Sequence, residues 1–406
     1  MRIGILTFHS EINYGSVLQA YALQTHLQSL GHDVVIIDKW ENADNRRLLG
    51  PFSKKSVVFW CKYLYHGLLL SGAVGRIRRH IKTYFMIRRY LKLTSYHFYR
   101  WDEAPKDLGV DVIVVGSDQV WNPIIVDPPD YLLKSVPSSI PGIAYAASIG
   151  QHELDERWKQ EYIEGFRRFV AIGVREKEAK RLVEATGSSA THVVDPTLLV
   201  DSKSCWDRFL ATCNGKKPRL FCYLMTQDVA EVLPLLSAFS KKMKAEVDVF
   251  LNNRMLPVFG KNFKGFKRWA SFHKQLTNGN VRICLSAAPN DFVRQIAQAT
   301  WVITESFHGL MFSTIFRKNV RVVQNNKNSV RKAMSARLTE FSDSIISGPL
   351  MASSMEGALS SLASGETIGY NERELDKRIS MSRKWLESAI EMVASKQGRR
   401  LMNRFK

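Results

Sequence analysis

The sequence has few cysteines, and they form no recognisable pattern. Among 406 residues there are five, odd in number and widely spaced, with no C-x-x-C: Cys61, Cys205, Cys213, Cys222 and Cys284. This spacing excludes a zinc ribbon and a disulfide framework and favours reduced thiols in a cytosol. The opening MRIGILTF also lacks the apolar core and small-residue cleavage site of a signal peptide. We therefore expect a cytoplasmic protein.

Sequence motifs for the common cofactors are also missing. There is no G-x-G-x-x-G for a dinucleotide and no G-x-x-x-x-G-K-[ST] for a phosphate-binding loop. No H-E-x-x-H, paired-cysteine or clustered-histidine site occurs, nor an Asp-x-Asp of the kind that holds a metal-bound nucleotide sugar. Metal-dependent mechanisms are therefore the less favoured class, and we expect neither a metal nor a cofactor.

Acidic side chains are absent from one long stretch. Residues 46–100 contain 13 Lys or Arg, eleven aromatic residues and no Asp or Glu, and thus hold most of the formal net charge of +20. Such a pattern is typical of a segment that binds nucleic acid or an anionic membrane surface, or of a solvated helical insertion. Because the rest of the chain resembles an enzyme, we expect no nucleic-acid partner. We favour contact with a membrane surface or with a phosphate-bearing acceptor.

No apolar run is long enough to cross a membrane. The most apolar part of the basic stretch, residues 57–74, is interrupted by Lys62 and His66. It falls short of the roughly 20 residues that a span needs. This part predicts an interfacial or core helix instead.

Apolar β-branched runs alternate with amphipathic segments along most of the chain. Residues 3–8, 16–30 and 33–37 predict a strand, a helix and a strand, which is a β-α-β unit with parallel strands. A second alternation begins near residue 218. The pattern predicts an α/β protein with two Rossmann-like domains, whose active site lies in the cleft at the carboxyl ends of the strands.

The domain boundaries follow from this alternation. We expect an N-terminal Rossmann-like domain at 1–200, with a basic aromatic helical insertion at about 45–100. A C-terminal Rossmann-like domain follows at 201–370. Residues 371–406 are expected to form a helix and a basic tail.

Ser306-Phe307-His308-Gly309 follows the predicted strand at 301–304. Ser306 is a natural helix N-cap, and His308 falls in the first turn. There the free N–H groups favour an anion, and a histidine is placed to give it a proton. A capped helix with a structural histidine explains the same four residues equally well.

Two further segments end predicted strands. Gly116-Ser117-Asp118-Gln119 would point Asp118 and Gln119 into the cleft, or would form a turn capped by Asp118. Arg175 at the end of another strand is suited to grip a carboxylate or phosphate, although a surface pair with Glu176 or Glu178 is the plainer explanation. Asp195-Pro196-Thr197 predicts a structural turn.

Together these segments resemble the bacterial polysaccharide pyruvyl transferase family. The resemblance rests on Asn13-Tyr14-Gly15, G-S-D-Q-V-W-N-P at 116–123, Y-A-A-S-I-G at 145–150, V-R-E at 174–176, D-P-T at 195–197 and S-F-H-G at 306–309. It spans roughly residues 1–330 and implies a two-domain fold similar to the glycosyltransferase B type. It also implies transfer of pyruvate from phosphoenolpyruvate onto two sugar hydroxyls, as a cyclic ketal, with release of phosphate.

The resemblance also implies roles for individual residues. His308 becomes the general acid, Asp118 orients or deprotonates the hydroxyl, and Arg175 binds the anionic donor. The residues expected to bind substrate are Asn13, Gly15, Ser117, Gln119, Ser306, Gly309 and either Lys327 or Arg331. The donor is phosphoenolpyruvate, and the acceptor implied is a sugar on a polyprenyl diphosphate at the inner membrane face.

The leading hypothesis is therefore a pyruvyl transferase of capsule or exopolysaccharide assembly, peripheral at the membrane through residues 46–100. Two alternatives stay open. One is a nucleotide-sugar-dependent glycosyltransferase of the same fold, since a fold does not determine a function. The other is a non-catalytic protein that binds a membrane surface through the basic stretch.

Overall fold

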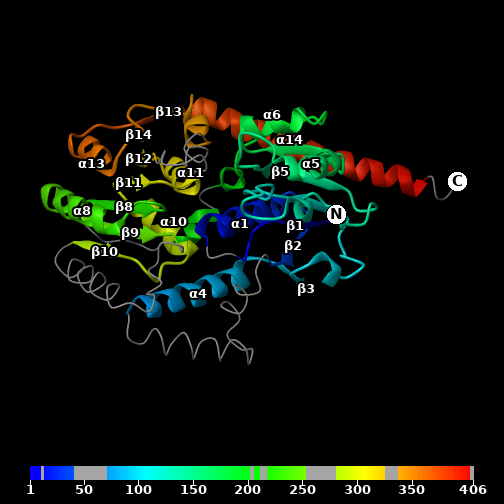
Figure 1. Cartoon of the computed structure of the whole chain (residues 1–406), viewed down its shortest axis with the longest axis horizontal. Coiled ribbons are helices and arrows are strands. Elements are labelled where there is room, and N and C mark those ends of the chain that lie inside the picture. Colours follow the sequence, from blue (N-terminus) through cyan, green and yellow to red (C-terminus); the bar gives the residue numbers. More distant parts are fainter. Residues whose placement is uncertain are drawn as a thin grey trace.

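The computed structural model describes residues 1–10, 13–40, 71–201, 205–210, 217–252, 280–324 and 337–402. They form two parallel α/β sheets with helices on their faces, side by side along the long axis of the molecule (Figure 1). The expected α/β class with two Rossmann-like units is confirmed.

The N-terminal sheet has seven parallel strands in the order β3-β2-β1-β4-β5-β6-β7. Their bounds are β1 Arg2–Leu6, β2 Asp33–Lys39, β3 Leu93–Phe98, β4 Val112–Val115, β5 Gly142–Ala147, β6 Phe169–Val174 and β7 Thr191–His192. The central strands are apolar on both faces because helices cover both. On one face, Ile3 and Ile5 pack with α1 (Tyr14–Ser29). On the other face, Leu6 packs with α5 (Lys159–Phe166) and α6 (Lys177–Glu184).

The C-terminal sheet has six parallel strands in the order β10-β9-β8-β11-β12-β14. Their bounds are β8 Arg219–Leu224, β9 Glu246–Leu251, β10 Val281–Ile283, β11 Trp301–Thr304, β12 Asn319–Val323 and β14 Met351–Ala352. One face packs on α8 (Val229–Met243) and α13 (Met355–Ala363). Helices α10 (Pro289–Gln298) and α11 (Phe307–Ile315) pack between the other face and α1, and β13 (Ile346–Ser347) pairs antiparallel with β15 (Gly369–Tyr370).

One hydrophobic cluster runs through both units. At its centre the ring of Tyr14, the first residue of α1, stacks on Phe292 of α10 with 5.0 Å between ring centroids. Trp206, which follows the N-terminal unit, meets Phe312 of α11 edge-on at 4.8 Å. Because this shared core is apolar and fully buried, it fixes the two sheets relative to each other.

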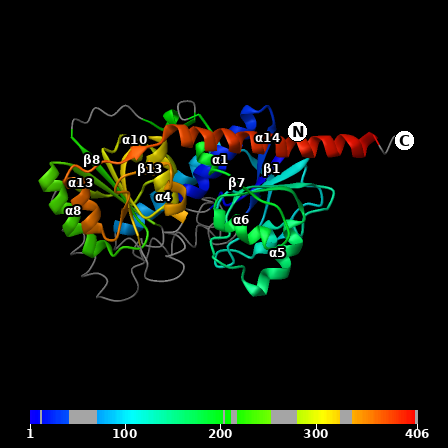
Figure 2. The ribbon, with the colours of Figure 1, turned by 90° about the horizontal axis from the view of Figure 1, so that it is seen from above.

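The C-terminal helix α14 (Glu372–Met402) returns to the N-terminal sheet (Figure 2). Trp385 covers Gly173 of β6, where an added Cβ would lie 2.8 Å from the indole ring. The N–H of Val194 donates to Ser382 Oγ at 3.0 Å, and Arg383 Nε donates to the carbonyl of Leu199 at 2.8 Å. Helix α14 therefore joins the C-terminal unit to the N-terminal one a second time.

Helix α4 (Ser71–Tyr90), within the basic stretch, lies against both units. Arg79 is completely buried there, donating from Nη1 to the carbonyl of Leu251 at 3.0 Å, with its guanidinium 5.1 Å from the centre of the Tyr14 ring. Lys92 and Arg100 pair with Asp33 and Asp102 but their side chains stay more than half exposed, so of these three cations Arg79 alone is withdrawn from solvent. None of the described helices is long and apolar enough to cross a membrane.

Some expected element boundaries need correction. The insertion expected to be helical to about residue 100 ends in strand β3, because its alternating Thr94, Tyr96 and Phe98 suit the sheet edge that it occupies beside β2. Residues 155–169, whose sequence also predicts a helix, form a short 3-10 helix at Glu156–Trp158 followed by α5, since Phe169 already begins β6. The remainder of the insertion, 45–70, lies outside the described residues.

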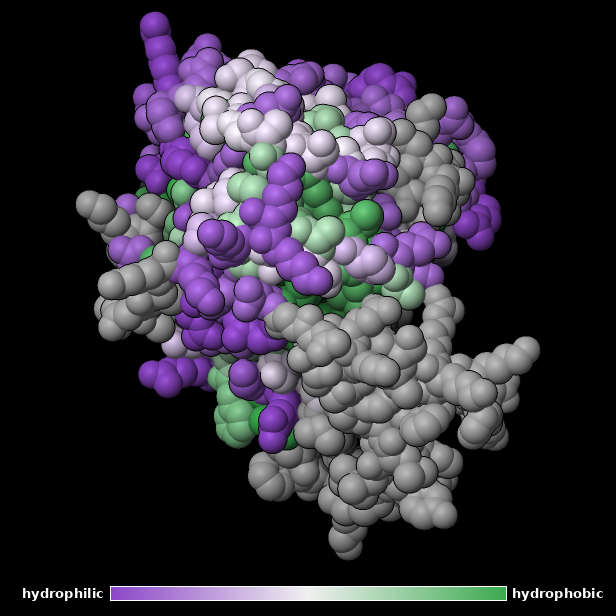
Figure 3. Space-filling view, turned by 90° about the vertical axis from the view of Figure 1, so that its left-hand side faces the viewer, coloured by the Kyte–Doolittle hydropathy of each residue, from purple (hydrophilic) through white to green (hydrophobic). Residues whose placement is uncertain are grey.

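Figure 3 views the end of the molecule formed by the C-terminal unit. Hydrophilic side chains dominate its described surface, with smaller apolar areas between them. Large apolar side chains that are exposed lie scattered in the described chain, and the most exposed are Phe85, Met381 and Ile124. Isolated apolar side chains of this kind are ordinary on a protein surface.

Candidate active site

Asp118, Arg175 and His308 come together where the two units meet. Asp118 follows β4, Arg175 directly follows β6, and His308 is the second residue of α11, after β11. All three thus stand at carboxyl ends of parallel strands, two in the first sheet and one in the second. Sequence reasoning expected this position, and the structure places the three side chains in one buried cluster.

Arg175 is the centre of a buried ion network. Its Nε lies 3.0 Å from Glu176 Oε1, Nη1 lies 3.2 Å from Asp195 Oδ2, and Nη2 lies 3.8 Å from Asp118 Oδ1. Its guanidinium also lies 4.4 Å from the centre of the Phe307 ring. Burial opposes the charge, but the three carboxylates outweigh it and raise the pKa of Arg175. Arg175 is therefore a fixed cation that organises carboxylates, and its fork is already occupied.

Asp118 is held as a carboxylate. One oxygen accepts from Ser16 Oγ at 2.8 Å, and the other accepts from the N–H of Gln119 at 2.9 Å. Burial alone would raise the pKa of Asp118, but Arg175 and His308 lower it below its ordinary value. Its backbone has φ +75°, a left-handed conformation that aspartate tolerates better than most residues. The turn after β4 thus aims an ionised carboxylate at Arg175.

His308 lies against the backbone of Gly15. A Cβ at Gly15 would lie only 2.0 Å from His308 Nδ1, so no larger residue fits beneath the ring. Its Nε2 has no hydrogen-bond partner among the described residues and lies 3.7 Å from Asp195 Oδ2. Burial lowers the pKa of His308 below 6.5, although Asp195 and Asp118 oppose that shift. The imidazole is therefore neutral near pH 7 in the unliganded site.

Asp195 has a larger part in the site than the sequence suggested. Its Oδ1 accepts from the N–H and the hydroxyl of Thr197 at 3.0 and 2.8 Å, which is the structural turn that was expected. Its Oδ2 faces Arg175 and Ser117, with His308 just beyond hydrogen-bond distance. The same carboxylate therefore caps a turn and places negative charge beside the imidazole.

Arg337 was not predicted from the sequence. It is 9% exposed, and its Nη1 lies 4.0 Å from Glu176 Oε1. Burial lowers the pKa of Arg337, and its Nε has no hydrogen-bond partner in the part of the chain that the structure describes. Arg337 belongs to no recognised motif and does not follow a predicted strand. Nothing in the sequence therefore distinguishes it from an arginine exposed on the surface.

Several predicted binding residues make contacts inside the protein. Asn13 Oδ1 accepts from the N–H of Gly15 at 3.1 Å and so caps α1. Ser117 is fully buried, and its Oγ donates to Asp195 Oδ2 at 3.3 Å. Gln119 Oε1 accepts from the side-chain amide of Asn122 at 2.7 Å. These contacts position the helix and the turn that present Asp118 and the His308 ring.

Ser306 and Gly309 shape the start of α11. Ser306 Oγ accepts from the N–H of Gly309 at 3.4 Å, as expected of an N-cap. A Cβ at Gly309 would lie 2.2 Å from Thr304 Oγ1, so glycine lets the helix begin directly on β11. Lys327 and Arg331, the two candidates for a phosphate-binding cation, lie outside the described residues.

The described cluster has more negative than positive charge. Three carboxylates face two guanidinium groups, those of Arg175 and Arg337, while His308 is neutral. Within the described ranges no group of three His, Cys, Asp or Glu side chains is arranged to hold a metal ion. The arrangement offers a buried imidazole whose protonation an arriving anion would favour.

Two Rossmann-like units that share a strand-end site define a fold of the glycosyltransferase B type. A putative UDP-N-acetylglucosamine 2-epimerase from Listeria monocytogenes has this fold (TM-score 0.52, 7% identity, 96% of this chain and 95% of that one). An epimerase from Neisseria meningitidis bound to UDP-GlcNAc (0.49, 8%, 97% and 100%) and the glycosyltransferase SnogD from Streptomyces nogalater (0.39, 12%, 97% and 99%) are more distant in TM-score. At such identities the likeness concerns the fold alone. No curated protein matches the sequence.

The sequence itself identifies the family. A family model described as polysaccharide pyruvyl transferase matches residues 13–327, which include Gly15, Asp118, Arg175 and His308. The chain belongs to the polysaccharide pyruvyl transferase family, and the resemblance drawn from its motifs is confirmed.

Proposed function

We propose that the chain transfers the pyruvyl group of phosphoenolpyruvate onto two hydroxyls of a sugar, as a cyclic ketal, and releases phosphate. One observation carries the proposal beyond the family: the buried His308 Nε2, without a hydrogen-bond partner among the described residues, lies at the start of α11. Helix N–H groups attract an anion, and an unpaired imidazole nitrogen is able to pass a proton to it. Phosphoenolpyruvate is an anion whose methylene carbon must be protonated.

The proton donor in this proposal is His308. In the unliganded site burial lowers the pKa of His308, so the ring is neutral. Bound phosphate and carboxylate groups add negative charge beside the ring and raise that pKa, because an opposite charge favours the protonated form. The substrate thereby creates the acid that it needs.

The ketal forms in two additions. His308 protonates the methylene carbon, and a sugar hydroxyl attacks the oxocarbenium-like centre that this leaves. The carbon–oxygen bond to phosphate then breaks, and the second hydroxyl attacks to close the ring. Of the two hydroxyl protons, one restores His308 and the other leaves with hydrogen phosphate. Because Arg175 and His308 lower its pKa, Asp118 orients the hydroxyl and takes its proton only as the new bond forms.

The donor needs further cations. The fork of Arg175 is occupied, and the described cluster is negative overall. We assign the carboxylate of phosphoenolpyruvate to Arg337, whose Nε has no hydrogen-bond partner among the described residues, and the phosphate to Lys327 or Arg331. Both of the latter lie in the sequence between Gln324, which directly follows β12, and Arg337.

The acceptor and location belong to the same proposal. A sugar on a polyprenyl diphosphate, at the cytoplasmic face of the membrane, suits the charge of residues 46–100, and the ketal would be added during capsule or exopolysaccharide assembly. We propose that no metal or organic cofactor takes part.

Phosphate release tests this function directly. Full-length protein is incubated with phosphoenolpyruvate and a lipid-linked oligosaccharide in EDTA, and the product is examined by mass spectrometry for an added carboxyethylidene group. We expect phosphate and ketal in equal amounts, and neither from a folded His308→Gln variant. Phosphate release that survives in this variant would rule out His308 as the acid. A thermal shift with UDP and no phosphate release would favour a nucleotide-sugar glycosyltransferase.

A further inference from the structure

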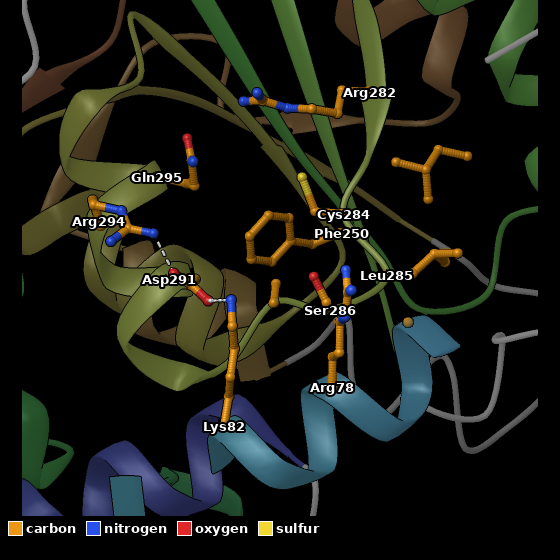
Figure 4. A pocket seen from close by; sticks show the side chains of 13 residues that line it. Arg78, Lys82, Phe250, Arg282, Cys284, Leu285, Ser286, Asp291, Arg294 and Gln295 are labelled. Atoms are coloured by element: carbon orange, nitrogen blue, oxygen red, sulfur yellow. Dashed lines mark hydrogen bonds and ion pairs between the residues drawn. The ribbon is translucent and has the colours of Figure 1, made fainter. Parts of the chain in front are cut away.

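A pocket lies between α4 and the C-terminal sheet, apart from the cluster around His308. It has a volume of about 620 Å³ and opens between α4, the end of β10 and the first turns of α10 (Figure 4). Helix α4 is pressed against the segment after β10, since a Cβ at Gly75 would lie 2.5 Å from Leu285 Cβ. The docking of α4 against this segment therefore forms one wall of the pocket.

Four cationic side chains from three elements line this pocket: Arg78, Lys82, Arg282 and Arg294. Figure 4 shows Arg78 and Lys82, one turn apart on α4, reaching toward the segment after β10 and toward α10. Arg282 projects from β10 and Arg294 from α10. The side chains of Lys82 and Arg282 are 52% and 61% exposed, so their charges are open to a ligand.

The carboxylates nearby offset only half of this charge. Asp248 pairs with Arg282 at 2.7 Å, and Asp291 pairs with both Arg294 and Lys82. Arg78 has no hydrogen bond or ion pair with any residue that the structure describes. Four cations against two carboxylates leave a local excess of two positive charges, which suits a ligand with more than one negative charge, such as a diphosphate ester.

The pocket also has an apolar wall, formed by Phe250, Ile283 and Leu285. Phe250 joins the pocket to the active-site cluster, because its ring centroid lies 5.7 Å from that of Tyr14, and Tyr14 precedes the Gly15 that supports His308. The rings of Phe250 and Tyr14 would thus separate a ligand in this pocket from His308.

We propose that this pocket binds the diphosphate of a diphosphate ester, with the organic group against its apolar wall. The identification of that ester as the carrier of the acceptor sugar rests on the proposed function, whereas the binding of diphosphate is independent of it. The ester has two chemical sources, a prenyl diphosphate and a nucleoside diphosphate, and both present the same group to Arg78 and Lys82.

Calorimetric titration of the full-length protein at low ionic strength tests the inference. The probes are inorganic phosphate, inorganic pyrophosphate, farnesyl diphosphate and UDP, each with phosphoenolpyruvate present in excess to occupy the His308 cluster. We expect pyrophosphate to bind about tenfold more tightly than phosphate, as several charge-assisted contacts require. Whichever ester binds more tightly than pyrophosphate identifies the organic group that the apolar wall accepts.

The double variant Arg78→Ala, Lys82→Ala should weaken pyrophosphate binding by about tenfold or more. The matched control removes Arg88 and Arg89, two exposed arginines at the end of the same helix that do not line the pocket, and should leave affinity within about twofold. Arg78→Ala alone removes no described contact, so it measures the site even if the double variant unfolds.

Two results would overturn the inference: equal affinity of the wild type and both α4 variants for pyrophosphate, or pyrophosphate binding no tighter than phosphate. Turnover is not read in this experiment. A protein that binds pyrophosphate through Arg78 but never releases phosphate from phosphoenolpyruvate would contradict the proposed function and leave the pocket assignment standing.

Discussion

The imidazole of His308 lies directly on the backbone of Gly15, with room for a hydrogen but none for a methyl group. Gly15 belongs to the first turn of α1 in the N-terminal unit, and His308 to the first turn of α11 in the C-terminal unit. The position of the candidate acid thus depends on how the two units dock. A change in that docking would move His308 relative to Asp118.

Gly15→Ala is therefore expected to displace the His308 ring while leaving the fold intact. The added methyl group meets a side chain that can swing aside, and alanine suits a helix at least as well as glycine. We expect phosphate release to fall by about 100-fold, because a misplacement near 1 Å is costly for a catalytic group. Steady-state kinetics and the circular-dichroism melting curve measure the two effects separately.

Gly357→Ala provides the matched control, since Gly357 stands in the first turn of α13 with only Ser354 Oγ nearby, at 3.3 Å. That variant should keep full activity. Wild-type turnover in Gly15→Ala would mean that the contact between Gly15 and His308 does not position the acid.

Much of this arrangement was accessible from the sequence. Apolar β-branched runs predicted the central strands, because parallel strands are buried on both faces and leave a continuous signal. S-F-H-G after a strand predicted a capped helix with His308 in its first turn, and both features are observed. Local patterns succeed where the physical cause is itself local.

Long-range features escaped sequence reasoning. Arg175 was expected to grip substrate, yet it is held by Glu176, Asp195 and Asp118, which only the fold brings within reach. Arg337 has no motif, since its burial depends on residues more than 150 positions away. The buried Arg79 was counted as surface charge, because composition does not reveal which face of α4 packs against the core.

Arg175→Ala should destabilise the protein strongly. Removal of the guanidinium leaves three carboxylates around an empty, buried space, and breaking a buried network of this kind costs about 3–5 kcal/mol. The free energy of unfolding, measured by urea denaturation, should fall by that amount. Arg175→Lys should recover part of it, because a lysine restores the charge but not the planar fork.

Arg181→Ala is the companion measurement for this network. Arg181 also pairs with a glutamate, Glu178, but its side chain is 60% exposed. Solvent screens such a pair, so the denaturation midpoint should hardly change. Equal losses in Arg175→Ala and Arg181→Ala would contradict the organising role of Arg175.

The pH profile of turnover should report the protonation of His308. Burial lowers the pKa of His308 in the free protein, and bound substrate anions raise it. A general acid loses activity as pH rises through its pKa, so kcat should begin to fall at a higher pH than kcat/KM does.

Asp118→Asn sharpens this test, because Asp118 is one of the charges that raise the pKa of His308. In that variant the falling limb of kcat/KM should move to lower pH. Asp107→Asn, which removes an exposed carboxylate just before the amino end of β4, at the edge of the sheet opposite the site, serves as the control for lost charge. Profiles for kcat and kcat/KM that fall together at one pH in the wild type would argue against substrate-induced protonation.

Acid should weaken the docking of α14 through His26. Burial, assisted by Arg383 of α14, lowers the pKa of His26 to about 4, whereas the unfolded chain titrates near its ordinary 6.5. Between these values the unfolded state binds a proton that the folded state does not, so the free energy of unfolding falls as pH falls from 6.5 to 4, by about 3 kcal/mol at most.

In His26→Gln this contribution to the pH dependence should vanish, while His152→Gln, at an exposed position, should follow the wild type. Urea denaturation across this pH range decides the matter: a wild-type slope in His26→Gln would show that another group responds to acid.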